Sequence, residues 1–316
     1  MSIRRSVVAG ALAVVAAISG VQPAGAQGRG GENLYTPEPG ARDLKATLFN
    51  WAWHMGMLRG QAEPELIQTL EYRAEGTIDV DGEACTATEY VEAEPGILGE
   101  SGYRISANYR IPGYRTEIEC TLPDGETYSN IETMSGEYAW DEDIPGAEII
   151  PGEGTATPRP AALEERRIRL WASLHGAPKA AIAAAAGVPV AESFGENPAV
   201  LLDRQAAAGV QSMTTLEWQG DKAVLTFPLP DLPGAVATAT LADFLPESVV
   251  VRHGNDTTEF VYGDFRDFNN PLHRIDALYA GTIVERHNGE VVRELRTIVT
   301  EIGQAYVVVP VPDSVR

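Results

Sequence analysis

Apolar residues repeat with a helical period near residue 43 and with a strand period from residue 70. Within Asp43–Arg59 they recur at spacings of three and four, which predicts an amphipathic helix. The members of this stripe are Leu44, Leu48, Trp51, Met55 and Leu58. From Leu70 to Val80 apolar and polar residues alternate instead, which predicts a β-strand with one solvated face.

The rest of the chain continues the strand pattern, with one helical block inside it. Segments from Tyr103 to Leu122 alternate, and the range 160–209 predicts two or three short helices. Alternation returns from Met213 to Val311, and Asn288-Gly289 there is the dipeptide that a two-residue type I′ hairpin favours. Helices and hairpins without regular strand–helix alternation predict an α+β fold with one large antiparallel sheet.

The first 26 residues have the pattern of a secretory signal peptide. Arg4 and Arg5 precede an apolar run of about a dozen residues, which is shorter than the roughly 20 that span a bilayer. Pro23 and the small residues of 24–26 follow, so we expect cleavage near Ala26. The arginine pair fits an ordinary signal and also a twin-arginine signal.

Cleavage near Ala26 predicts a product in the periplasm or outside the cell. Gln27, not cysteine, follows the expected cleavage site, so we expect no lipid anchor there. Residues 27–40 are rich in Gly and Pro and predict a flexible leader. One α+β domain is expected at 41–316, with the helical block near 160–209 as an insertion.

The chain is strongly acidic, with 45 Asp and Glu against 24 Lys and Arg and a net charge of −21. Loss of the two arginines on cleavage makes the mature protein more acidic still. Such a surface repels phosphate backbones and anionic head groups, which excludes nucleic-acid binding. No later apolar run reaches transmembrane length, so we expect a soluble protein that does not span a membrane.

Cys85 and Cys120 are the two cysteines of the chain. In an oxidising compartment we expect them to form a disulfide, which would stabilise the fold by roughly 3–4 kcal/mol on a chain-entropy model. A metal site or a reactive thiol is the alternative. That alternative would be expected to show a CxxC spacing or a neighbouring histidine, and the sequence has neither.

Candidate residues for catalysis or metal binding are few. The five histidines have no metal-binding spacing and no serine lies in a nucleophile motif, so we predict neither metal nor cofactor. Asp264, Arg266 and Asp267 form the most unusual polar segment. They offer an acid or base and an anion clamp. The alternative is a β-turn with internal Asx hydrogen bonds and a buried Arg–Asp pair.

Aromatic residues are the best candidates for a ligand cavity between the sheet and the helices. The set is Trp51, Trp53, Trp140, Trp171, Trp218, Tyr103 and Tyr109, together with His54 and Met55 of the first predicted helix. Cavities that bind small molecules are lined mainly by such side chains. An ordinary filled core is the alternative, because aromatic residues also dominate protein interiors.

The C-terminal hairpins resemble those of the outer-membrane lipoprotein carrier superfamily and its lipoprotein-sorting relatives. The matching run is Phe260-Val261-Tyr262-Gly263-Asp264-Phe265-Arg266, then Asn270–Ile275 and the paired strands Leu278–Arg286 and Val291–Ile302. The first helix leading into Leu70–Val80 is also similar to the start of that family. The resemblance covers about half of the mature chain.

This resemblance implies a curved, half-open antiparallel barrel with helices over its concave side. In that family the hollow holds acyl chains or other apolar groups, and no catalytic motif is shared. The chain differs from the usual carriers by its additional helical block near 160–209 and by its acidity.

We therefore predict a periplasmic protein that binds an apolar ligand, a lipid or a lipidated partner in a half-barrel cavity. One alternative is a secreted lyase or hydrolase that uses a cavity carboxylate or His54. Another is an envelope interaction protein without a ligand. A binding protein predicts few ionisable groups at the cavity, whereas an enzyme predicts buried Asp, Glu or His with perturbed pKa values.

Overall fold

A computed structural model describes residues 35–58, 67–91, 100–193, 196–268, 277–302 and 307–316 of the 316-residue chain. These residues belong to one compact unit, Tyr35–Arg316. The predicted signal peptide and most of the predicted leader lie outside the described residues. So does the segment Asn270–Ile275, which carries part of the family resemblance.

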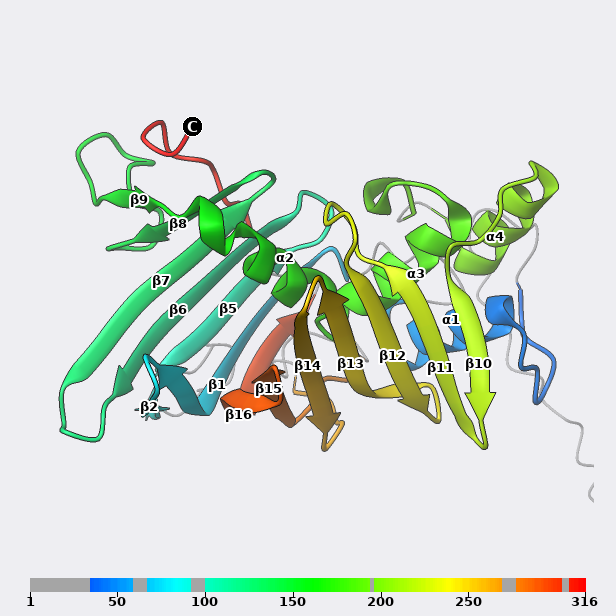
Figure 1. The fold of residues 1–316 in the computed structure, drawn as a ribbon, viewed down its shortest axis with the longest axis horizontal. Coiled ribbons are helices and arrows are strands. Elements are labelled where there is room, and N and C mark those ends of the chain that lie inside the picture. The colour runs from blue at the N-terminus through cyan, green and yellow to red at the C-terminus, as the bar shows by residue number, and fades with distance from the viewer. Residues whose placement is uncertain (1–34, 59–66, 92–99, 194–195, 269–276, 303–306) are drawn as a thin grey trace, which may run out of the picture. The chain divides into compact units, whose positions relative to one another are not determined.

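The described strands form one 14-stranded antiparallel sheet and a separate β3–β4 pair (Figure 1). The sheet order is β10-β11-β12-β13-β14-β15-β16-β1-β2-β6-β7-β8-β9, with β5 paired to β1 and β6. The N-terminal strands are β1 (Thr69–Val80), β2 (Glu83–Ala87), β3 (Glu89–Val91), β4 (Glu100–Ser101), β5 (Tyr103–Asn108), β6 (Gly113–Thr121), β7 (Thr127–Ser135), β8 (Tyr138–Glu142) and β9 (Ala156–Pro158). The C-terminal strands are β10 (Thr215–Gln219), β11 (Lys222–Pro228), β12 (Val236–Ala242), β13 (Leu245–His253), β14 (Asp256–Gly263), β15 (Thr282–His287) and β16 (Glu290–Ile302). The predicted large antiparallel sheet is confirmed.

Short helices accompany the sheet. They are α1 (Leu44–His54), α2 (Leu163–Trp171), α3 (Gly176–Ala186) and α4 (Pro198–Ala207), with 3-10 turns η2 (Pro160–Ala162) and η3 (Val190–Ser193). Helix α1 begins at a cap, because Asp43 Oδ1 accepts a hydrogen bond from the N–H of Ala46 at 2.9 Å. It ends at His54, before the predicted Arg59, since Gly56 takes a left-handed conformation with φ +71°.

Strand β1 lies at the centre of the sheet and pairs with three strands. It pairs with β16 along one edge, while β5 and β2 share the other edge, opposite residues 69–74 and 76–80 respectively. Gly76 lies where these two partners meet. Its φ is +147°, and a Cβ atom there would lie 2.0 Å from the carbonyl oxygen of Glu294. Only glycine allows β1 and β16 to approach this closely.

The burial of two polar side chains on β1 differs from the prediction. Glu71 and Arg73 were expected on a solvated face, but both are buried. Glu71 Oε2 accepts a hydrogen bond from Arg104 on β5 at 2.7 Å and another from Ser106 at 3.2 Å. Charged residues can be buried when they are paired in this way, so alternation alone overestimated the solvent exposure of this central strand.

Two tight hairpins use left-handed backbone conformations. Asn288 and Gly289 join β15 to β16 with φ values of +50° and +89°, which confirms the predicted type I′ turn. Asp243 and Phe244 join β12 to β13 in the same way, with φ values of +49° and +62°. The second turn contains neither Gly nor Asn, so the sequence did not signal it.

Helices α2 and α3 contact strands of the sheet. Helix α3 is buried along its whole length. Helix α2 is fastened by Arg166, which donates from Nη1 to the carbonyl oxygens of Thr133 at 2.8 Å and Trp140 at 2.7 Å. Just after α2, the carbonyl oxygen of Ala172 accepts a hydrogen bond from the Tyr262 hydroxyl at 2.9 Å. These contacts hold α2 over the middle of the sheet.

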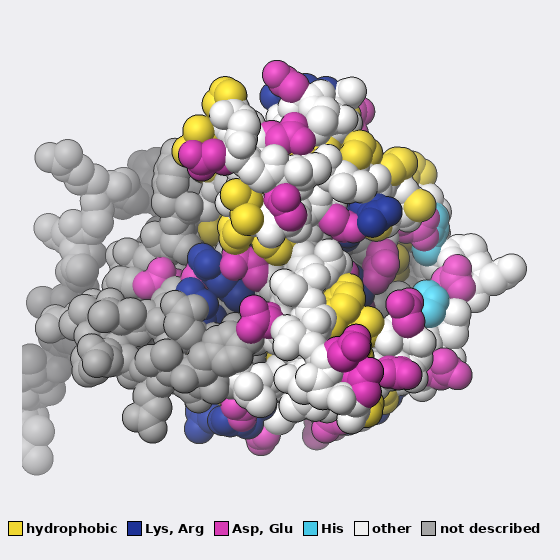
Figure 2. Space-filling model, turned by 90° about the vertical axis from the view of Figure 1, so that its left-hand side faces the viewer, with side chains coloured by type: hydrophobic (Ala, Val, Ile, Leu, Met, Phe, Trp, Pro, Cys, Tyr) yellow, Lys and Arg dark blue, Asp and Glu magenta, His cyan; other side chains and the backbone are white. Residues whose placement is uncertain are grey.

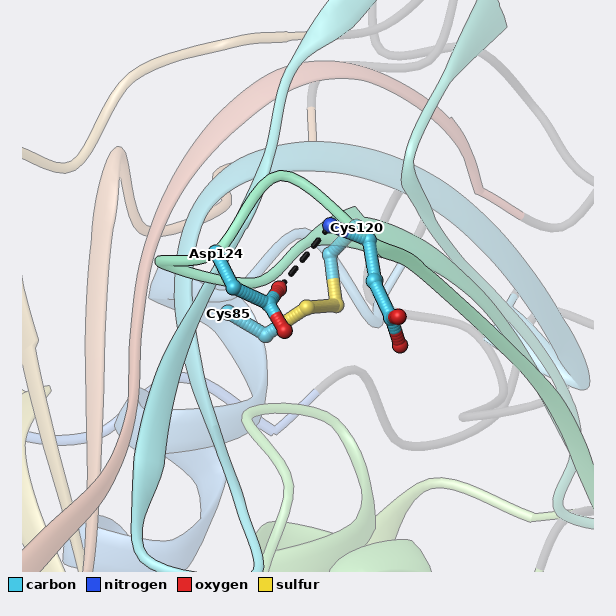
Figure 3. Close-up of a disulfide and its surroundings, with 4 residues drawn as sticks. Cys85, Cys120 and Asp124 are labelled. Carbon is cyan, nitrogen blue, oxygen red and sulfur yellow. Dashed lines mark hydrogen bonds between the residues drawn. A yellow bond between two sulfur atoms is a disulfide. The ribbon is translucent and has the colours of Figure 1, made fainter.

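The predicted disulfide between Cys85 and Cys120 is confirmed, with the two Cα atoms 5.5 Å apart. It joins β2 to β6 where, within the described residues, their ladder consists of the single pair Thr86 and Thr121. Figure 3 shows the bond beside the β6–β7 turn, in which Asp124 Oδ1 accepts a hydrogen bond from the backbone of Glu126 at 2.9 Å. The covalent link therefore reinforces the strand pairing that has the fewest paired residues among the described strands of the sheet.

Carboxylate side chains are distributed over the face of the molecule at its β7–β9 end, with separate hydrophobic side chains among them (Figure 2). This distribution is consistent with the net charge of −21. Among the described residues, no helix combines the length and the apolarity that crossing a bilayer requires.

Candidate ligand-binding site

A small cavity lies between the middle of the sheet and α2. Its walls come from β1, β5, β6 and β14–β16 on the sheet side, and from Leu170, Ser173 and Leu174 on the helical side. We call it the tyrosine cavity, after the members Tyr72, Tyr103, Tyr109, Tyr114, Tyr262 and Tyr279. Its volume is about 40 Å³, enough for a few water molecules at about 10–15 Å³ each. In this closed form it does not hold a lipid.

The hydroxyls of Tyr103 and Tyr109 bond to groups around the cavity. Tyr109 Oη lies 3.1 Å from Ser173 Oγ, and Arg293 Nη1 donates to Tyr103 Oη at 3.1 Å. The Tyr114 hydroxyl is buried without a hydrogen-bond partner among the described residues. Burial raises the pKa of Tyr103 and Tyr109, so their hydroxyl groups stay neutral.

Two arginines and two glutamates form what we call the ionic cluster, at one end of the tyrosine cavity. Arg169 Nε lies 3.0 Å from Glu285 Oε1, and its Nη1 lies 3.2 Å from Glu132 Oε2. Arg293 Nη2 lies 3.2 Å from the same Glu132 oxygen. Burial opposes the charge of Glu132, but Arg293 and Arg169 outweigh it and lower the pKa of Glu132 to about 2. Arg169 also pairs with the exposed carboxylate of Glu165 on α2.

The ionic cluster also borders a second, solvent-open groove on its outer side. Arg169, Glu285 and Arg293 line both this groove, of about 410 Å³, and the tyrosine cavity. His253 lies at the groove and contacts Glu164, and the hydrogen bond to that carboxylate raises the pKa of the imidazole. Within the described residues, no three His, Cys, Asp or Glu side chains come together in a way that could hold a metal ion.

A larger apolar groove lies on the other side of Tyr109. Its volume is about 470 Å³, and α3 and the segments after α3 and β11 form its walls. We define the apolar groove by Trp171, Ala180, Ala183, Ala184, Val188, Val190, Met213, Pro228 and Leu229. Tyr109 lines both this groove and the tyrosine cavity, and its ring centroid lies 6.3 Å from that of Trp171. Tyr109 is thus the partition between the two spaces.

Two buried basic residues, Lys179 and His175, lie beside tyrosines of the cavity, His175 with its ring centroid 5.8 Å from that of Tyr279. Lys179 Nζ is 5.5 Å from the ring centroid of Tyr109, and burial lowers the pKa of Lys179 to about 7. Burial, followed by the charge of Lys179, lowers the pKa of His175 to about 3. Lys179 lines neither the tyrosine cavity nor the apolar groove. It sits in the protein interior, one side chain away from both.

The residues proposed from sequence as one cavity fall into separate places. Tyr103 and Tyr109 line the tyrosine cavity, and Trp171 lines the apolar groove with Tyr109. Trp51 and Met55 are fully buried in the main core. Trp140 belongs to a smaller core cluster with Ala156, Val307 and Val309. The aromatic set is therefore divided between cavity walls and filled core.

The other predicted site residues are at the surface. His54 and Trp53 are exposed, and Trp218 is half-buried at the opposite end of the sheet from β9. Asp264, Arg266 and Asp267 are exposed in the segment after β14. The guanidinium of Arg266 lies 4.4 Å from the ring centroid of Phe268. Asp264, Arg266 and Asp267 line neither the tyrosine cavity nor the apolar groove.

Several cavity residues were missed by the sequence reasoning. They are Tyr72, Tyr114, Tyr262, Tyr279, Glu285 and Arg293. A signal existed for Tyr72 and Tyr262, since both alternate with polar residues on predicted strands. Glu285 and Arg293 gave none, because a charged residue on a strand is normally assigned to the solvated face.

The sequence gives no match to models of known protein families and none to curated proteins. The function must therefore be argued from the chemistry of the two adjoining spaces and the side chains that separate them.

Proposed function

We propose that this protein is exported and binds the acyl chain of a lipid in the apolar groove beside α3. The tyrosine cavity is then the inner end of the same site. The observation that carries the proposal is that Tyr109 lines both spaces. The proposal includes a half-open barrel, cleavage of residues 1–26, and work in the periplasm or outside the cell.

The apolar groove supports the proposal by its size and its lining. At about 470 Å³ it lies in the range of roughly 300–1,000 Å³ typical of small-molecule sites. Its walls are Ala, Val, Pro, Leu, Met and Trp side chains, which suit a hydrocarbon chain. Arg110 and Asp231 lie at the groove as well, so a polar head group can remain near charged side chains and water.

Movement of Tyr109 would join the groove to the tyrosine cavity. In the closed form the Tyr109 hydroxyl is held by Ser173 at 3.1 Å, at the end of α2. Rotation of the ring away from Ser173 would open a path past Leu170 and Leu174 toward the sheet. The unpartnered hydroxyl of Tyr114 would then be available to a polar group or a water molecule that enters with the ligand.

The ionisable groups of the tyrosine cavity favour binding over catalysis. Glu132 and Glu285 are held by Arg169 and Arg293, and the pKa of Glu132 is far below neutrality. General acid–base catalysis needs a group whose pKa lies near the working pH. Glu132 is not such a group, and the ionic cluster gives the end of the cavity a fixed polar wall.

A secreted hydrolase or lyase is the second candidate, and Lys179 is the observation that favours it. A lysine with a pKa of about 7 is half neutral at physiological pH and can act as a nucleophile or base. Turnover of p-nitrophenyl esters by the wild type, lost in Lys179→Met, would favour this candidate. Absence of turnover in a protein that still binds fatty acid would favour the binding function.

Two measurements test the binding proposal. Native mass spectrometry of mature protein from the periplasm of the producing bacterium should show a co-purifying lipid. After delipidation, the protein should bind the fluorescent fatty acid cis-parinaric acid. Met213→Glu should weaken that binding at least about tenfold, because it puts a charge beside the hydrocarbon chain.

Val291→Glu is the matched control for this variant. Met213 and Val291 are both exposed, at 57% and 47%, but Val291 lies on β16 outside the groove. The control should bind cis-parinaric acid like the wild type. Equal binding by the two variants, or no binding by the wild type, would contradict the proposal.

A further inference from the structure

A set of exposed and half-buried rings lies at the β10 end of the sheet, where α1, β10 and the β12–β13 hairpin meet. We call it the aromatic platform and define it by Trp53, His54, Trp218 and Phe244. The His54 and Phe244 ring centroids are 5.3 Å apart, and Trp218 meets Phe244 edge-on at 6.4 Å. Trp53 is 42% exposed and stacks on Phe49, which fixes its orientation. Three separate elements thus present one continuous aromatic surface.

Phe244 has an unfavourable backbone conformation. It has φ +62° in a two-residue hairpin turn, a position that favours glycine or asparagine. The turn would form more easily with those residues, so hairpin formation does not explain an aromatic side chain here. Backbone strain of this kind is concentrated at binding and catalytic sites.

Two grooves flank Phe244, which acts as the ridge between them. One has a volume of about 400 Å³ and contains Trp53, His54 and Asn50. The other has about 230 Å³ and contains Trp218, Arg42 and Asp221. Gly40, Ala41 and Phe244 line both. An elongated ligand could therefore occupy both grooves and cross the Phe244 ring.

The polar groups around the platform include several hydrogen-bond acceptors, together with one donor, Arg42, whose guanidinium lies 4.5 Å from the ring centroid of Trp218. His54 Nδ1 donates to the carbonyl oxygen of Asn50 at 2.8 Å, which leaves Nε2 as the ring nitrogen available to a ligand. The carboxylates of Asp221 and Asp243 are acceptors too. Such a site suits a ligand rich in hydroxyl groups. The net charge of −21 disfavours an anionic one.

We propose that the aromatic platform binds a neutral oligosaccharide. A pyranose ring has an apolar C–H face that packs on an aromatic ring and an edge of hydroxyl groups that donate to acceptors. Trp53 and Phe244 supply the flat faces, while His54, Asp221 and Asp243 supply the acceptors. This site is separate from the apolar groove and does not depend on the function proposed for it.

Saturation-transfer difference NMR with cellotetraose, maltotetraose and chitotetraose tests the proposal on the mature protein. At least one of the three sugars should receive saturation through its ring C–H protons. Trp53→Ala and Phe244→Gly should each weaken its binding at least about tenfold. Because glycine favours the backbone conformation of residue 244, Phe244→Gly should keep the hairpin and lose the sugar.

Two controls separate a binding role from a structural one. Val291→Ala changes an exposed apolar residue outside both grooves and should bind the sugar as the wild type does. Phe244→Gly should unfold at a Tm no lower than that of Trp53→Ala, so that unfolding does not account for its loss of sugar binding. The proposal is overturned if none of the three sugars binds, or if binding survives in both platform variants. It is also overturned if tetramethylammonium displaces the sugar and binds more tightly, which would indicate a cation site.

Discussion

The hydroxyl of Tyr109 lies 3.1 Å from Oγ of Ser173, and this hydrogen bond holds the Tyr109 ring between the apolar groove and the tyrosine cavity. Ser173 Oγ itself donates to the carbonyl oxygen of Leu170 at 2.7 Å at the end of α2. The partition is therefore tied to the helix that covers the cavity. A change at this contact should alter the rate at which a ligand passes between the apolar groove and the tyrosine cavity.

Tyr109→Phe should make ligand exchange faster. The variant keeps the ring but loses the hydrogen bond to Ser173, so the ring can leave its position more often. We expect faster association and dissociation of cis-parinaric acid in stopped-flow fluorescence, and a loss of about 1 kcal/mol in the free energy of unfolding.

Tyr138→Phe on β8 is the control for this change, since Tyr138 lines neither space. It should leave both rate constants as in the wild type. Unchanged rates in Tyr109→Phe would show that the hydroxyl does not hold the partition closed.

Glu285→Gln should destabilise the fold strongly. Glu285 is buried between Arg169, at 3.0 Å, and Arg293, at 3.7 Å. Its neutralisation leaves two buried guanidinium groups with Glu132 as their remaining buried carboxylate, besides the exposed Glu165 that pairs with Arg169. Breaking a buried ion pair in this way typically costs about 3–5 kcal/mol, which urea unfolding would measure.

Glu259→Gln is the matched control on the neighbouring strand. Its ion pair with Arg286 spans 3.1 Å, but both side chains are about one third exposed. Such a surface pair contributes about 0–1 kcal/mol. Equal losses of stability in the two variants would show that the ionic cluster stabilises the fold no more than a surface ion pair does.

The sequence predicted the sheet, the first helix, one hairpin turn and the disulfide. Alternation located strands such as β1, and the pair Asn288-Gly289 located a hairpin, because both signals are local. The disulfide could be predicted because the predicted signal peptide would place the chain in an oxidising compartment. These features depend on neighbours in the chain or on the compartment, and not on packing.

The candidate site was only partly predictable, for a physical reason. Tyr103 and Tyr109 were identified as aromatic residues on strands, but Trp51 and Trp140 have the same signal and fill the core. Whether an aromatic side chain meets a void depends on the residues opposite it, which come from distant strands and helices. The strained turn at Phe244 gave no signal, because tertiary packing and not turn preference sets its conformation.

Loss of the disulfide should lower stability without abolishing the sheet. Replacement of both Cys85 and Cys120 by Ala removes a link across 35 residues, which should cost roughly 3–4 kcal/mol. Reduction of the wild type should produce a similar loss in urea unfolding, and reduction should not affect the double variant. A variant as stable as the oxidised wild type would show that the β2–β6 contact needs no covalent support.

The stability of the protein should rise with pH because of Lys179. Burial lowers the pKa of Lys179 from the ordinary 10.5 to about 7 in the folded protein. Between these two values the unfolded chain binds more protons than the folded one. The free energy of unfolding should therefore increase from about pH 7 to about pH 10 and be lowest where Lys179 is charged in both states.

Lys179→Met isolates this effect, because it keeps the length of the side chain and removes the titrating amine. The variant should be more stable than the wild type at and below pH 7, by a few kcal/mol, and the difference should shrink as pH rises toward 10. Urea unfolding at several pH values would measure it, with Lys222→Met, half-exposed and paired with Glu247, as control. A difference between wild type and Lys179→Met that does not change with pH would show that the buried amine keeps its charge in the folded protein.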